Sequence, residues 1–191
     1  MLKIREIRME AACWLDRRTI YRGRVIEVEV DRVRLPNGTE TELEMVRHPG
    51  AAAIVPFENK EDILLVRQFR WATGGWIYEI PAGKLEGESD PALCAARELR
   101  EEVGRKAGRL EFLGTIWTTP GFTDEAIHLF MATELEPVAQ ALEEDEVLQV
   151  VRLPFLEALD KVRRGEIPDA KTQCALAQVV LRRQHACRGA S

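Results

Sequence analysis

The segment Gly83–Arg105, GKLEGESDPALCAARELREEVGR, constrains this chain more than any other stretch of its sequence. Glu101 and Glu102 follow Glu98 by three and four residues, so on a helix the three carboxylates share one face. Like charges at this spacing destabilise an isolated helix. The alternatives are a solvated acidic face or a bound cation, and hard oxygen ligands of this kind suit Mg²⁺ or Mn²⁺.

The sequence also predicts where this helix begins and ends. Asp90 is a suitable N-cap, Pro91 fits the first helical position and Gly104 fits the C-terminal cap. Opposite the acidic patch we expect an apolar stripe, made of Leu93, Ala96, Leu99 and Val103.

Composition indicates a globular protein of one large domain, or of one domain with a small appendage. The chain has 191 residues, of which 46% are hydrophobic and 31% charged. Its net charge of −5 argues against a nucleic-acid partner. The four cysteines form no C-x-x-C pair, which favours reduced thiols in a cytoplasmic protein. We expect neither a signal peptide nor a membrane span, because no apolar run is long enough.

Ahead of the main domain the sequence predicts a β-hairpin over residues 19–48. Ile26, Val28 and Val30 alternate with acidic residues as in a half-buried strand, and Pro36-Asn37-Gly38 is a strong turn signal. Residues 1–18 are expected to form a short strand or helix at a subunit contact. We therefore predict an N-terminal region, residues 1–48, that takes part in dimerisation, and a second domain over residues 49–191.

The second domain alternates strand and helix signals. Strands are predicted at 51–57, 62–69, 110–118, 127–135 and 147–153, and helices follow at 154–164 and 169–185. This order favours a mixed sheet between helices, in the α/β class.

The segment 83–105 resembles the Nudix box, G-x5-E-x7-R-E-U-x-E-E-x-G-U, where U is a bulky apolar residue. The positions that agree are Gly83, Arg97, Glu98, Leu99, Glu101, Glu102 and Gly104. Ser89 stands where the first Glu is expected, with Glu88 one position earlier, and Arg105 replaces an apolar residue. Chance agreement at the core Arg-Glu-x-x-Glu-Glu-x-Gly is expected about once in a million start positions.

The resemblance implies an α/β/α sandwich that hydrolyses a nucleoside diphosphate linked to another group, with the help of Mg²⁺ or Mn²⁺. Glu98 and Glu102 are similar to the main metal ligands of the family. Glu101 and the backbone carbonyl of Ala82 resemble further ligands. Arg97 resembles a residue that orients a carboxylate and holds the loop on the helix; a surface arginine is the alternative.

The flanking sequence resembles one branch of the family, the ADP-ribose pyrophosphatases. Pro120 lies fifteen residues beyond Arg105, and TPGFTDE (119–125), VRQFR (66–70) and IYEIPAGKLE (77–86) are similar to segments of that branch. Its members are dimers in which an N-terminal hairpin helps to complete the partner's site. The resemblance implies substrate contacts from Arg70, Glu125 and, in the substrate loop, Phe122. Tyr21, Arg47 and Arg67 are further candidates, because adenine needs a flat apolar partner and phosphates need cations; for Arg67 the alternative is a side chain that points to solvent.

A general base has to take a proton from the attacking water. In this branch it lies in a loop after the box, which here is Leu142–Glu146, LEEDE. Glu144 matches the base best, Glu143 is the alternative in a shifted register, and Glu146 matches a further metal ligand. A solvated acidic loop is the alternative for the whole segment.

Three functions remain open at this point. The first is hydrolysis of ADP-ribose to AMP and ribose 5-phosphate, and the second is hydrolysis of another nucleotide sugar such as GDP-mannose. The third is a Nudix-like module that senses a nucleotide without cleaving it. The third is disfavoured because the acidic core of the box is complete, and the residues after 165 are too few for a further domain.

Overall fold

The structure is a computed structural model, and it describes residues 11–88, 90–142 and 146–188. The chain forms two compact units. The first comprises Met1–Pro49 and Thr119–Glu125, and the second comprises Gly50–Thr118 and Ala126–Ser191. The segment 119–125 therefore groups with the N-terminal region, although the predicted division places it in the second domain.

The first unit contains an antiparallel sheet in the order β1-β2-β3. Its strands are β1 (Cys13–Arg22), β2 (Glu27–Arg34) and β3 (Glu40–Arg47). The predicted turn joins β2 to β3, where Leu35 N donates to Thr39 O at 2.8 Å. The hairpin is thus confirmed, and β1 extends it to three strands. The sequence showed no clear period in residues 13–18 because almost every side chain of β1 is exposed.

The buried side of β2 is the opposite of the one that its pattern predicts. Glu29 and Asp31 are buried, whereas Val28 and Val30 are only half-buried. Arg17 of β1 donates to Asp31 at 2.7 Å and Arg47 of β3 donates to Glu29 at 2.7 Å. The predicted alternation of side chains along β2 is present, but the acidic side is the buried one because arginines of β1 and β3 cover it.

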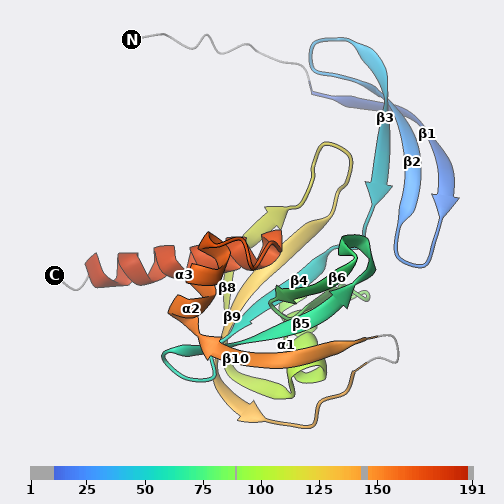
Figure 1. The fold of residues 1–191 in the computed structure, drawn as a ribbon. Coiled ribbons are helices and arrows are strands. Elements are labelled where there is room, and N and C mark those ends of the chain that lie inside the picture. The colour runs from blue at the N-terminus through green and yellow to red at the C-terminus, as the bar shows by residue number, and fades with distance from the viewer. Residues whose placement is uncertain (1–10, 89, 143–145, 189–191) are drawn as a thin grey trace. The chain divides into compact units, whose positions relative to one another are not determined.

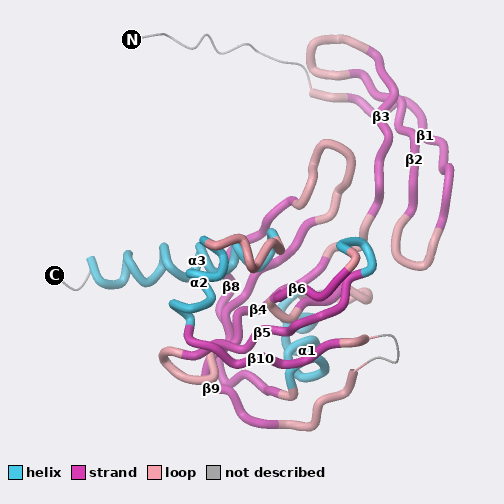
Figure 2. Tube along the Cα trace, in the orientation of Figure 1, coloured by secondary structure: helices cyan, strands magenta, loops and turns pink. Residues whose placement is uncertain are grey.

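The second unit contains two sheets, in the orders β10-β5-β6 and β7-β4-β9-β8 (Figures 1 and 2). The strands are β4 (Ala51–Pro56), β5 (Asp62–Arg70), β6 (Gly75–Glu79), β7 (Ala82–Lys84), β8 (Arg105–Trp117), β9 (Ala126–Pro137) and β10 (Leu148–Pro154). A short 3₁₀ turn, η1 (Trp71–Thr73), lies between β5 and β6. β4 pairs with β9 in parallel and the other pairs are antiparallel, so the predicted mixed arrangement is present.

Helices cover both faces of β4 and β5. Ile54 and Leu64 pack with α1 (Pro91–Val103), whereas Val55 and Leu65 pack with α2 (Phe155–Arg163) and α3 (Ala170–Arg188). Successive side chains of a strand point to opposite faces, so both faces must be apolar. This explains why the stretches 51–57 and 62–66 are almost continuously apolar.

The box helix α1 has the predicted ends. The Asp90 side chain accepts a hydrogen bond from Ala92 N at 2.9 Å, and Gly104 ends the helix with a left-handed φ of 65°. The predicted apolar stripe is half wrong, because Leu93 and Ala96 are exposed while Leu99 is buried. Their places against the sheet are taken by other small side chains, those of Cys94 and Ala95.

Arg105, the unexpected charge after the box, has a partner of its own. Its guanidinium donates two hydrogen bonds to the Glu58 carboxylate, at 2.9 and 3.0 Å. Glu58 lies in the turn between β4 and β5. The arginine therefore ties the start of β8 to that turn instead of packing an apolar side chain at the helix end.

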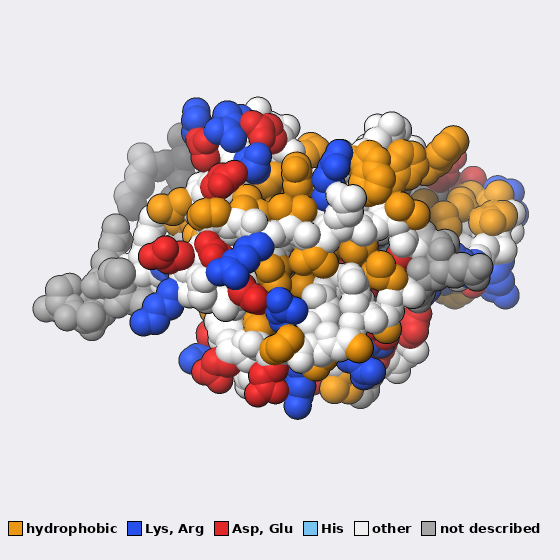
Figure 3. Space-filling model, turned by 60° about the horizontal axis from the view of Figure 1, so that its bottom comes forward, with side chains coloured by type: hydrophobic (Ala, Val, Ile, Leu, Met, Phe, Trp, Pro, Cys, Tyr) orange, Lys and Arg blue, Asp and Glu red, His pale blue; other side chains and the backbone are white. Residues whose placement is uncertain are grey.

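On the face drawn in Figure 3, lysine and arginine side chains lie among aspartate and glutamate side chains. Surface pairs such as Arg163 with Asp160, at 2.7 Å, are screened by solvent and add little to stability. The thiols of Cys13, Cys94 and Cys174 are free. Among the described helices, none combines the length and the apolar character needed to cross a membrane.

The start of α3 is bound to the end of β6 through Thr172, which is fully buried. Its hydroxyl accepts a hydrogen bond from Ile80 N at 2.8 Å and donates to Asp169 at 2.5 Å. Thr172→Val should lower the free energy of unfolding by about 1–3 kcal/mol, because Ile80 N loses its buried acceptor. Urea unfolding followed by circular dichroism measures this change.

Thr172→Ser is the matched control. It keeps the hydroxyl and removes one methyl group, so it should be less destabilising than the valine variant. A valine variant as stable as the wild type would show that this hydrogen bond does not hold α3 to β6.

Candidate active site

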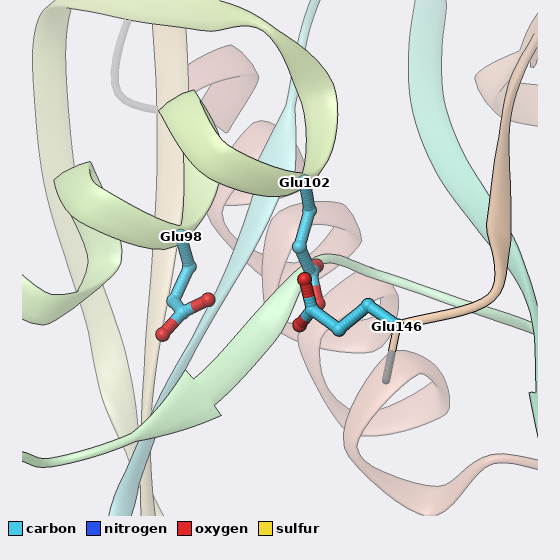
Figure 4. A group of neighbouring side chains, drawn as sticks. All are labelled: Glu98, Glu102 and Glu146. Atoms are coloured by element: carbon cyan, nitrogen blue, oxygen red, sulfur yellow. The ribbon is translucent and has the colours of Figure 1, made fainter. Parts of the chain in front are cut away.

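Three carboxylates converge beside α1. Glu98 and Glu102 come from that helix and Glu146 from the segment just before β10 (Figure 4). Each offers an oxygen, and these oxygens all lie within 4.8 Å of one another. Figure 4 shows Glu146 reaching toward the helix from the opposite side of the group. Several carboxylate oxygens in one small space are the ligand set that suits a hard divalent cation.

Two of these carboxylates are buried, and keeping them charged costs free energy unless a cation pairs with them. Glu98 and Glu102 are only 5% and 2% exposed. Burial, followed by the charges of Glu98 and Glu146, raises the pKa of Glu102 to about 8. Burial also raises the pKa of Glu98 to about 7, and Arg97 offsets only part of that effect. A divalent cation would relieve both effects by pairing the buried charges, so the residues fit a metal site.

The backbone of β7 closes around the two helix carboxylates. Ala82 N donates a hydrogen bond to Glu102 at 3.1 Å. A Cβ atom at position 83 would lie 1.8 Å from Oε1 of Glu98, so only glycine leaves room for this carboxylate. Gly83 is therefore required by close approach. Residues 82–84 themselves form a short strand that pairs with β4.

Arg97 binds three carboxylates and the loop before the helix. Its guanidinium donates to Glu98 at 2.6 Å, to Glu101 at 3.1 Å and to Glu88 at 3.1 Å. It also donates to the carbonyl of Lys84 at 3.1 Å. This geometry suits an orienting residue.

Two positions of the segment 83–105 differ from what its resemblance to the Nudix box implies. Glu88 takes the contact with Arg97, and Ser89 lies outside the described residues. Glu101 is half exposed and does not belong to the converging group of Glu98, Glu102 and Glu146. Its contact with Arg97 occupies the carboxylate instead, and its predicted role as a metal ligand stays a prediction.

Arg70, at the end of β5, is held by a residue that sequence reasoning missed. Its guanidinium donates two hydrogen bonds to the buried Glu79, at 2.7 and 3.0 Å. Lys171 of α3 pairs with the same carboxylate and with Asp169, the latter at 3.0 Å. Glu79 stands in the IYEIPAG stretch, but no local signal showed that cations distant in sequence would meet there.

Arg67 lies on the other face of β5 from Arg70. Its guanidinium sits 5.2 Å from the centre of the Trp76 ring, a cation–π contact on the neighbouring strand β6. Trp71, just after β5, is 88% exposed.

The other predicted substrate residues belong to the first unit, where Arg47 joins β3 to the loop 119–125. It donates to Asp124 at 3.1 Å and to Glu29 at 2.7 Å, and it also pairs with Asp31. Asp124 in turn accepts a hydrogen bond from His48 N at 2.9 Å. Arg47 is thus occupied by three carboxylates.

The loop 119–125 is bound to β3 through its backbone as well. Val46 N donates to Phe122 O at 2.7 Å. Phe122 and Tyr21 of β1 expose more than half of their surface, at 52% and 57%. Glu125 lies 3.7 Å from the imidazole of His48. These side chains line the surface of the first unit.

The predicted general base belongs to the acidic loop 142–146, which the structure describes only in part. Glu144 and its alternative Glu143 lie outside the described residues. Glu146, the end of the same acidic loop, is described and belongs to the converging group.

The raised pKa values predict an unusual pH dependence for the metal-free protein. Between about pH 4.5 and pH 8, the folded protein holds more protons on Glu98 and Glu102 than the unfolded chain does. The free energy of unfolding should therefore fall as the pH rises through this window. Glu102→Gln removes one of the charges while an amide oxygen can still accept from Ala82 N. The variant should be more stable than the wild type by about 1–3 kcal/mol at pH 9.

Urea unfolding in the presence of a chelator, at pH 5 and at pH 9, measures both effects. The advantage of the Glu102→Gln variant should be small at pH 5 and grow toward pH 9. An advantage that does not change with pH would contradict the buried, proton-binding carboxylates.

Comparison with known proteins gives a family match. The model of the NUDIX domain matches residues 46–173. The chain is 43% identical over 164 residues to the methanol dehydrogenase activator of Bacillus methanolicus, covering 85% of this chain and 89% of the relative. It is 41% identical over 165 residues to the ADP-ribose pyrophosphatase of Bacillus subtilis (strain 168), again covering 85% and 89%.

A solved structure has the same fold. The crystal structure of an ADP compounds hydrolase superposes with a TM-score of 0.81 at 24% identity, covering 93% of this chain and 97% of the other. This likeness confirms the predicted α/β/α class.

Proposed function

The chain belongs to the NUDIX family, and we propose that it hydrolyses the diphosphate bond of ADP-ribose, or of a related nucleoside diphosphate sugar. With ADP-ribose the products are AMP and ribose 5-phosphate. The observation that carries this proposal is the convergence of Glu98, Glu102 and Glu146, two of them buried, beside the glycine of β7. Such a group is costly unless it binds a cation, and diphosphate hydrolysis needs one.

Some residues of the site would hold the metal ion, and Arg97 orients one of these ligands. A bound Mg²⁺ or Mn²⁺ neutralises phosphate oxygens and lowers the pKa of a bound water. Glu98, Glu102 and Glu146 hold the ion, and Glu101 and the carbonyl of Ala82 are further proposed ligands. Arg97 orients Glu98 through its contact at 2.6 Å, and it fixes the preceding loop.

In the second unit, the proposed substrate contacts are arginine side chains. Arg70 offers a guanidinium to the diphosphate, and its bidentate contact with Glu79 fixes the direction in which it points. Arg67 is a further cation. In the first unit, Tyr21 and Phe122 offer exposed rings to the adenine and Glu125 offers a carboxylate to the terminal ribose.

We assign Arg47 a role through the loop that it holds. Its guanidinium already binds three carboxylates, among them Asp124 at 3.1 Å. It therefore positions the loop that carries Phe122 and Glu125. Glu144 remains the proposed general base, with Glu143 as its alternative.

The proposed reaction is tested with a panel of ADP-ribose, GDP-mannose and other nucleoside diphosphate derivatives in the presence of Mg²⁺. ADP-ribose should be cleaved with the highest kcat/KM, and the products identified by chromatography should be AMP and ribose 5-phosphate. Glu102→Gln should lower kcat at least 100-fold, because it removes the charge of a buried metal ligand. Arg109→Gln, an exposed change on β8, is the control and should keep full activity.

Each other outcome has a distinct meaning. Preferred cleavage of GDP-mannose would change the substrate and leave the mechanism. No cleavage of any compound, or full activity of the Glu102→Gln variant, would refute the hydrolase. Nucleotide binding without cleavage would instead favour a sensing module.

We also propose that the protein is a cytoplasmic homodimer joined through the first unit. This small sheet leaves several large apolar side chains exposed, namely Trp14, Ile20 and Leu43. A three-stranded sheet has little core of its own, so a second copy that covers these side chains would stabilise it.

Sedimentation velocity tests the dimer. The wild type should sediment as a dimer at micromolar concentration, and Ile20→Arg should shift the population toward monomer by placing a charge among the covered apolar side chains. Leu156→Arg, an equally simple change at an exposed leucine of α2, should leave the dimer intact. A monomeric wild type would contradict this proposal.

A further inference from the structure

One buried polar side chain of the second unit has no assigned task. Gln68 lies on β5 and is 7% exposed. Within the part of the chain that the structure describes, its Oε1 atom is buried without a hydrogen-bond partner. A buried acceptor that finds no donor costs free energy, and its presence in a folded protein calls for a ligand or a water that supplies the donor.

The strand places this side chain beside the carboxylate group. Leu64 and Val66 pack with α1, and Gln68 follows them on the same face of β5 because alternate residues share a face. Arg70 comes next on that face. Its pKa is raised by Glu79 above all and further by the charge of Glu102, so the Glu102 carboxylate is close by.

The third carboxylate is tied to the same point of β5. Gln68 pairs with Leu148 of β10, and Phe69 N donates to Val147 O at 3.2 Å. These contacts fix the segment that begins with Glu146 next to Gln68. Along β5, Gln68 therefore lies between Val66, which packs with α1, and Arg70, which is close to Glu102. Across the sheet, its neighbour is β10, the strand that follows Glu146.

The chemistry of the neighbours limits what the amide oxygen can accept. Once a cation is bound, the carboxylates that hold it are ionised, and they and the diphosphate oxygens then offer no proton. Arg70 binds Glu79 through its Nε and Nη2 atoms, at 2.7 and 3.0 Å, and in the described structure none of its N–H groups donates to Gln68 Oε1. A water molecule bound to a metal ion does offer protons, and residues around a metal site commonly accept them.

We propose that Gln68 accepts a hydrogen bond from a water molecule bound to the metal ion that Glu98, Glu102 and Glu146 hold. Gln68 is thus a positioning residue that orients this water and does not ligate the ion itself. This inference rests on the proposed metal-dependent function. It gives a task to the one buried side-chain oxygen that the described structure leaves unpaired.

Gln68→Met tests the inference, because methionine has a similar shape and no polar atom. The dissociation constant of Mn²⁺ should rise about 10-fold or more, as measured by titration of the metal-free protein without substrate. The melting temperature of the metal-free variant should equal or exceed that of the wild type, because no buried acceptor is left unpaired. The opposite signs of these two effects distinguish a metal-directed residue from a general packing residue.

Two further variants keep the result interpretable. Gln149→Met makes the same change on an exposed position of β10 and should alter neither measurement. Glu102→Gln should weaken Mn²⁺ binding strongly; if it does not, the metal site and the proposed function fail together. If Glu102→Gln weakens binding and Gln68→Met does not, only the role of Gln68 is refuted. A lower melting temperature of metal-free Gln68→Met would also refute it, because the amide would then have a partner within the protein.

Discussion

The burial of two like charges on one helix is the constraint on which the rest of this site depends. Glu98 and Glu102 would repel each other and lose hydration if nothing compensated them. The protein supplies only part of the compensation, through Arg97 and through Ala82 N. The uncompensated part of this cost raises the pKa values of both carboxyls, and a divalent cation would remove it by pairing with their charges.

The second structural requirement is a fixed strand end opposite that helix. Thr172 at the start of α3 accepts from Ile80 N, and Lys171 pairs with the neighbouring Glu79. The chain then runs through Pro81 into the short strand that contacts the helix carboxylates. The C-terminal helix thereby helps to place both Arg70, through Glu79, and the backbone of β7.

Local patterns predicted the elements well and the partners poorly. The caps Asp90 and Gly104 act over one helical turn, so the limits of α1 could be read from the sequence. The same holds for the apolar stretches of β4 and β5. By contrast, Lys171 of α3, which pairs with Glu79, lies 92 residues away in the sequence. No pattern within β6 indicates this pairing. The sequence likewise suggested that β2 buries its valines, because the arginines of β1 and β3 that cover Glu29 and Asp31 are not part of its alternation.

Glu98 and Glu102 are buried and partly protonated at neutral pH, so binding of a metal ion must displace their protons. Calorimetric titration of the metal-free protein with Mg²⁺ or Mn²⁺ at pH 7, repeated in buffers of different ionisation enthalpy, counts the protons that binding releases. Binding of each metal ion should release about one proton or more, because Glu98 and Glu102 have pKa values of about 7 and 8 before binding. Metal binding with no proton release, or no metal binding, would contradict it.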